Sequence, residues 1–173
     1  CIDICPTNAF DAPNKLDATK CISYLTIENK DIIPKKYRVA IGNKIFGCDD
    51  CLAICPWNKY AKRTKEIKFN EDKYNFDLLK LLKLSDQDFR NQFSRSPIKR
   101  IGRDRFLRNC CVAAGNSKNV KLIPPLINLL MNDKSFLVRG AAVWALQQIG
   151  DQKILLKTKK LHLNFEKEGA VID

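Results

Sequence analysis

Two short segments near the start of the chain share one cysteine spacing. Cys1 and Cys5 form a Cys-x3-Cys-Pro sequence, and so do Cys51 and Cys55, with Cys48 placed to add a Cys-x2-Cys pair before the second. This is the closing part of the bacterial ferredoxin run Cys-x2-Cys-x2-Cys-x3-Cys-Pro, whose thiolates bind 4Fe–4S clusters. The spacing therefore predicts iron–sulfur chemistry, that is, the transfer of single electrons.

The ferredoxin pattern also predicts which thiolates share a cluster. In two-cluster ferredoxins the fourth cysteine of each run binds the other cluster. Applied here, and with Cys21 as the remaining cysteine of this region, the crossing gives one complete ligand set: Cys5, Cys21, Cys48 and Cys51. It leaves a partial set of Cys1 and Cys55, whose missing thiolates we expect before residue 1. We therefore interpret the chain as a fragment that contributes to two 4Fe–4S clusters.

Zinc is the alternative metal, because four thiolates in tetrahedral geometry suit either ion. Structural zinc sites use paired Cys-x2-Cys knuckles, whereas this chain has one such pair, Cys48 and Cys51. A purely structural role for one cluster also stays open. Cys110 and Cys111 are different, because adjacent residues of a helix point about 100° apart and rarely form a disulfide. We expect them to be small buried core residues.

The elements that carry these residues are predicted to be mainly helical. Apolar periodicity predicts helices over 76–84, 105–114, 124–131 and 135–149, the second closing near Gly115. Arg108 and Arg139 each precede a pair of small residues and a valine, at a separation typical of stacked helix pairs. The predicted fold is mainly α, with a ferredoxin-like double-cluster module (1–60), a basic linker and helix (61–104) and a HEAT-like helical repeat region (105–173).

The charge balance favours a polyanionic partner. Lys and Arg number 31 against 19 Asp and Glu, which gives a net charge of +12. Five basic residues lie in one stretch that is expected to feed a helix N-terminus and to contact phosphates: Arg95, Lys99, Arg100, Arg103 and Arg105. A solvated face is the alternative, and for Arg108 a structural role is as reasonable as a functional one. Without a membrane-spanning run or a signal sequence, we expect a cytoplasmic protein with no membrane partner.

Three segments followed by HEAT-like helices carry a resemblance to a known family. Residues 17–28, with Cys-Ile-Ser-Tyr-Leu-Thr-Ile-Glu, residues 42–51 and the Cys-Pro-Trp-Asn of 55–58 resemble epoxyqueuosine reductase, over 1 to about 150. The resemblance implies a cobalamin-dependent enzyme with two 4Fe–4S clusters, which reduces epoxyqueuosine to queuosine in tRNA with a GUN anticodon. It also implies a monomer, an unidentified electron donor, and a cobalamin domain and catalytic acid upstream of residue 1. No catalytic residue is therefore expected within the chain.

The resemblance gives the long insertion between Cys21 and Cys48 a role beside the cofactor. It implies that Ser23, Asp49 and Asp50 face cobalamin; the alternative is that the insertion forms local core and that the aspartates solvate a turn. Three other classes of protein stay open. One is the iron–sulfur module of another cobalamin-dependent reductase, of the reductive dehalogenase type, and the others are a ferredoxin-like electron carrier and a scaffold with a structural cluster. The basic helical region favours the tRNA enzyme over these.

Overall fold

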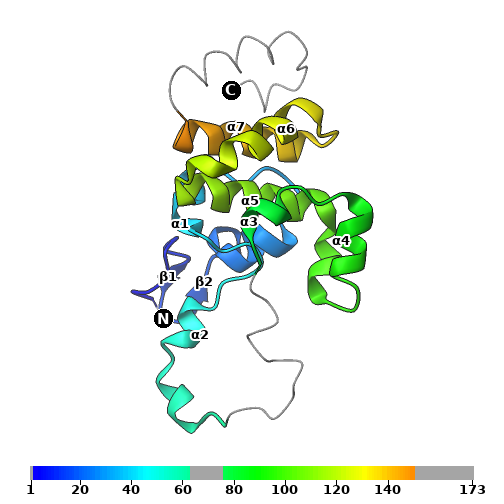
Figure 1. Cartoon of the computed structure of the whole chain (residues 1–173). Coiled ribbons are helices and arrows are strands. Elements are labelled where there is room, and N and C mark those ends of the chain that lie inside the picture. Colours follow the sequence, from blue (N-terminus) through cyan, green and yellow to red (C-terminus); the bar gives the residue numbers. More distant parts are fainter. Residues whose placement is uncertain (1, 63–75, 151–173) are drawn as a thin grey trace.

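The computed structural model describes residues 2–62 and 76–150 (Figure 1). Its first element is a small antiparallel hairpin of β1 (Phe10–Ala12) and β2 (Lys15–Leu16), in which Phe10 pairs with Leu16. Asn14 makes the turn at a φ of 62°, a left-handed conformation that asparagine tolerates better than most residues. The hairpin lies between Cys5 and Cys21 in the sequence, so one predicted ligand precedes it and another follows it.

The insertion between Cys21 and Cys48 is compact and largely helical. It contains a π-helix over Tyr24–Glu28 and helix α1 (Lys35–Ile41), which ends at Gly42 with a φ of 62°. Its apolar side chains turn inward: Leu25, Ile33 and Ile41 are all buried. The expected alternative, that this segment supplies core, is thus correct for Leu25. After the insertion, α2 (Asp50–Ala53) and a short 3₁₀ helix (Pro56–Tyr60) carry the second cysteine run.

The second half is an array of helices, as predicted. Its members are α3 (Leu78–Leu81), α4 (Asp86–Gln92), a 3₁₀ helix (Pro97–Ile101), α5 (Gly102–Ser117), a 3₁₀ turn (Val120–Leu122), α6 (Ile123–Asn132) and α7 (Phe136–Ile149). Helices α5, α6 and α7 stack on one another, and the N-terminal half lies on the other side of α5 (Figure 1). The helices predicted over 124–131 and 135–149 are confirmed as α6 and α7.

Three differences from the predicted helices have local causes. The helix expected over 76–84 is limited to α3, which begins at the Asp77 cap. Helix α4 was not predicted, although Ser85 and Asp88 form a capping box at its start. Helix α5 does not close near Gly115 but continues to Ser117, because Gly115 lies inside the helix against Trp144.

One hydrophobic cluster joins the insertion to the helical array. It runs from Ile22 through the phenylalanines of α4 and α5 to Leu146 of α7. Cys110 and Cys111 are fully buried within it, and burial raises the pKa of both thiols, so their interpretation as core residues is confirmed. The domain boundaries expected at residues 60 and 104 stay predictions; the tail 151–173 lies outside the described residues. No described helix has the length and apolar character needed to cross a membrane.

Candidate iron–sulfur site

The predicted ligands come from turns and helix ends. Cys21 caps a 3₁₀ helix (Ala18–Lys20), Cys48 precedes α2, Cys51 lies in its first turn, and Cys55 caps the 3₁₀ helix that Pro56 begins. These four and Cys5 are all partly exposed, unlike the two cysteines of α5. Cys1 lies outside the described residues. The five cysteines thus lie in partly exposed turns and helix ends, outside the hydrophobic core.

Cys5 lies in a turn that supports a thiolate. Its Sγ accepts a hydrogen bond from the Ala9 N–H at 3.3 Å and lies 3.6 Å from the Thr7 hydroxyl. Burial opposes ionisation, but these hydrogen bonds outweigh it, so that the pKa of Cys5 lies below its ordinary value. Donors aimed at a cysteine sulfur are a recurrent feature of iron–sulfur ligands.

Cys48 is held through its backbone. The Ser23 hydroxyl accepts from the Cys48 N–H at 2.9 Å and donates to its carbonyl at 3.2 Å. Burial, together with the charge of Asp50, raises the pKa of the Cys48 thiol. Asp50 also forms an ion pair with Lys44 at 3.1 Å, while Asp49 is exposed. Ser23, one of the residues expected to face cobalamin, is thus hydrogen-bonded to the backbone of the predicted ligand Cys48.

The described side chains do not form a site for a single metal ion. Within residues 2–62 and 76–150, no group of three or more His, Cys, Asp or Glu has that arrangement. The donors themselves are thiols, and the hydrogen bond to the Cys5 sulfur is of the kind that iron–sulfur ligands receive.

Two of the arginines predicted to contact phosphates bond within the protein instead. Arg103 donates to the Leu84 carbonyl at 2.9 Å and pairs with Asp133 at 2.7 Å. Arg105 donates to the carbonyls of Ile27, Arg100 and Ile101. Their guanidinium groups connect helices and the insertion, and the phosphate role expected for them stays a prediction.

The other three predicted contacts are exposed. Arg95 lies in the turn before the 3₁₀ helix at a φ of 61°, and Lys99 lies within that helix. Arg100 forms an exposed ion pair with Glu28 of the insertion at 2.8 Å. The available part of the basic segment is therefore small and borders the insertion.

Sequence reasoning missed a polar stripe on α5. Arg108 donates to the carbonyls of Leu25, Asn29 and Asp31, and Asn109 donates to those of Thr26 and Ile45. About two turns further along, Asn116 donates to the carbonyls of Arg38 and Gly42. The available signal was the helical spacing of these polar residues within an otherwise apolar helix.

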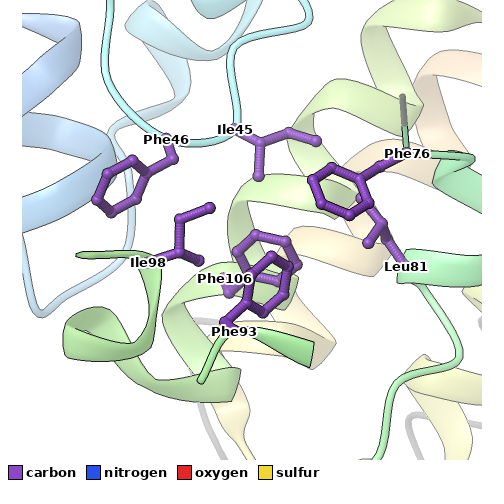
Figure 2. A pocket seen from close by; sticks show the side chains of 7 residues that line it. All are labelled: Ile45, Phe46, Phe76, Leu81, Phe93, Ile98 and Phe106. Carbon is purple, nitrogen blue, oxygen red and sulfur yellow. The ribbon is translucent and has the colours of Figure 1, made fainter. Parts of the chain in front are cut away.

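One apolar pocket of about 320 Å³ opens between the insertion and the helices (Figure 2). Side chains from both halves line it: Ile45, Phe46, Phe76, Leu81, Phe93, Ile98 and Phe106. Figure 2 shows Phe93 and Phe106 close together at one side; their ring centres lie 4.9 Å apart. With no titratable group in its lining, the pocket has no acid–base chemistry.

Comparison with known proteins assigns both halves. Residues 1–58 match the model of a 4Fe-4S double cluster binding domain, which favours iron–sulfur over zinc, and residues 107–149 match a HEAT-like repeat. An epoxyqueuosine reductase of Xanthomonas campestris pv. campestris is 46% identical over 153 residues, 87% of this chain and 43% of the relative. The Escherichia coli K12 epoxyqueuosine reductase is also 46% identical, over 68% of this chain and 31% of its own length.

The solved structures agree over nearly the whole chain. A crystal structure of epoxyqueuosine reductase with an epoxyqueuosine-modified tRNA-Tyr stem loop matches 99% of the chain with a TM-score of 0.91 at 31% identity. The chain is homologous to part of the epoxyqueuosine reductases. It covers 46% of that structure's chain, and the Streptococcus thermophilus epoxyqueuosine reductase gives a TM-score of 0.85 at 25% identity and equal coverage. The chain thus spans less than half the length of these epoxyqueuosine reductases.

Proposed function

We propose that this chain is the iron–sulfur and tRNA-binding part of an enzyme that reduces epoxyqueuosine to queuosine in tRNA with a GUN anticodon. The observation that carries the proposal is the structural match over 99% of the chain to an epoxyqueuosine reductase with a modified tRNA stem loop. We further propose that the enzyme is monomeric and cytoplasmic, that it takes electrons from a separate donor, and that its catalytic acid lies outside this chain.

The proposed ligands are Cys5, Cys21, Cys48 and Cys51 for one 4Fe–4S cluster, and Cys1 and Cys55 for part of the other. When bound, the clusters supply single electrons for the reduction of a corrin cofactor. The chain's own residues orient the thiolates: Ala9 and Thr7 hydrogen-bond Cys5, and Ser23 fixes the backbone of Cys48. We therefore propose that Ser23 acts on the ligand turn, and that Asp49 and Asp50 approach cobalamin.

An exposed apolar surface beside the ligands supports a larger protein around this module. Leu52, Ile54, Trp57 and Tyr60 are each more than half exposed, and Trp57 is 74% exposed. The four residues lie close together in the sequence, and the rings of Trp57 and Tyr60 are 5.7 Å apart; exposed apolar groups gathered in this way favour an interface. We propose that the remainder of the reductase, with cobalamin, covers this surface.

The proposed tRNA contacts are the exposed residues Arg95, Lys99 and Arg100. Their charges suit backbone phosphates. Individual RNA bases are recognised differently, by stacking and by hydrogen bonds to their edges. We also propose Arg103 and Arg105, which make internal bonds to Leu84, Asp133 and Ile27, as contacts of the same segment.

A chimera tests the proposal. This chain replaces the matching part of the Xanthomonas campestris relative, and the protein is incubated anaerobically with epoxyqueuosine-containing tRNA, cobalamin and a strong reductant. Nucleoside mass analysis should show the loss of one oxygen atom, dependent on cobalamin. The Cys48→Ala chimera is the control and should be inactive. A chimera that holds iron and cobalamin but leaves epoxyqueuosine unchanged would contradict the proposed function.

A further inference from the structure

Two side-chain hydroxyls of the insertion hold the turn that leads into Cys48. Ser23 Oγ accepts from the Cys48 N–H at 2.9 Å and donates to the Cys48 carbonyl at 3.2 Å. Thr26 Oγ1 accepts from the Gly47 N–H at 3.0 Å and donates to the Ile22 carbonyl at 2.7 Å. This pair, Ser23 and Thr26, is called the hydroxyl bracket below. The two hydroxyls accept hydrogen bonds from two successive backbone N–H groups, those of Gly47 and of the proposed cluster ligand Cys48.

The hydroxyl bracket is part of a closely packed arrangement. Thr26 is fully buried, and Gly47 has a φ of 82°, a conformation that side chains other than glycine's rarely adopt. A Cβ added at Gly47 would lie 3.7 Å from Ile27 Cδ1 and 4.0 Å from Ser23 Oγ. The insertion therefore lies directly against the ligand turn, and its hydroxyls have fixed partners there.

Helix α5 anchors the hydroxyl bracket from the opposite side. Asn109, which is fully buried, donates one amide group to the carbonyls of Thr26 and Ile45 at 2.7 and 2.8 Å. Its own carbonyl accepts from Arg108. The contact ties Thr26 and Ile45, which lie on the two sides of the insertion, to a helix of the HEAT-like region.

Groups that hold a metal ligand from behind orient its donor atom and matter nearly as much as the ligand itself. We propose that Ser23 and Thr26 are positioning residues, which fix the backbone of Gly47 and Cys48 so that the Cys48 thiolate is ready to bind the cluster. Asn109 anchors this hydroxyl bracket. The inference rests on the proposed cluster ligation by Cys48.

The test uses this chain, reconstituted anaerobically with ferrous iron and sulfide. The Ser23→Ala and Thr26→Val variants each remove one hydroxyl that holds this turn, so both should bind less iron per chain than the unmodified chain, with helical circular dichroism retained. The double variant should bind less still. The conservative Thr26→Ser and Ser23→Thr variants retain a hydroxyl and should restore the iron content.

Ser117→Ala is the matched control, because the Ser117 hydroxyl also donates to a backbone carbonyl, that of Ala114 at 2.7 Å, but at the far end of α5. Its iron content should not change. Full iron content in both Ser23→Ala and Thr26→Val would overturn the inference and leave the proposed function intact. An unmodified chain that assembles no cluster would instead contradict the cluster ligation itself, and with it both proposals.

Discussion

Arg108 shows how a buried charge serves the architecture of this protein. It is 1% exposed, and its guanidinium reaches the carbonyls of Leu25, Asn29 and Asp31. Burial, reinforced by the charge of Arg105, lowers the pKa of Arg108 to about 10. The planar guanidinium can serve several carbonyls at once, which the point charge of a lysine ammonium cannot. The positive charge is thus stabilised by backbone dipoles of the insertion.

We expect Arg108→Lys to destabilise the chain by about 3 kcal/mol, because at least one buried carbonyl would lose its donor. Chemical denaturation followed by circular dichroism measures the change in the free energy of unfolding. Arg100→Lys is the control, since its ion pair with Glu28 is exposed and should contribute little. Equal losses in the two variants would show that Arg108 does not hold the insertion.

At the scale of elements, the contact between α5 and α7 depends on a position without a side chain. Gly115 lies in the middle of the contact, where an added Cβ would meet the Trp144 ring at 2.6 Å and the Ala145 Cα at 2.9 Å. Trp144 is in turn 7% exposed and lies under the Arg38 guanidinium, 5.6 Å from the ring centre. The two helices therefore approach as closely as glycine permits.

The sign of the stability change in Gly115→Ala shows whether helix propensity or packing dominates at this position. Alanine in a helix interior gains up to about 1 kcal/mol over glycine, whereas overpacking costs about 1–3 kcal/mol. Because one contact is with backbone that cannot rotate away, we expect a net loss of about 1–2 kcal/mol. Thermal unfolding of the two proteins measures it. A raised melting temperature would mean that α5 and α7 have room to separate.

At the scale of the whole molecule, the net charge of +12 does not reveal which basic side chains face solvent. The guanidinium groups of Arg103, Arg105 and Arg108 make hydrogen bonds within the protein, to Asp133 and to backbone carbonyls. The exposed basic residues of the 95–105 stretch are thus fewer than the sequence indicates. Affinity for tRNA should depend on a small number of side chains there.

Replacing Arg95 and Lys99 with alanine should weaken binding of tRNA to this chain. If each contacts one phosphate, the slope of log K against log salt should fall in magnitude by up to about 2, since each contact releases close to one counterion. Filter binding over a salt series measures both quantities. Lys118→Ala with Lys121→Ala is the charge-matched control on exposed residues elsewhere. An unchanged slope in the Arg95 and Lys99 variant would remove these residues from the interface.

The sequence predicted those features that depend on local spacing. Cysteine runs imply their chemistry at any position in a fold, and the apolar periodicity of 124–149 was sufficient to predict α6 and α7. Arginine is different, because the same guanidinium suits a phosphate or a carbonyl, and only the packed insertion decides between them for Arg105. Gly115 similarly predicts a helix end from sequence, and only its tertiary contact with Trp144 explains why the helix continues past it. The roles of Ser23 and Thr26 depend on a turn more than 20 residues away along the chain.

The anchoring of the insertion by α5 has a consequence for how the protein is made. The hydrogen bonds of Arg108 and Asn109 join positions 64 to 83 residues apart, and contacts of such separation are slow to form because a long loop must close first. On the ribosome, the turn before Cys48 emerges well before the helix that anchors it. The thiols of Cys48 and Cys51 therefore exist for a time as unorganised nucleophiles. Metal loading should accordingly follow translation of α5, which makes the newly made chain most sensitive to oxidants during synthesis.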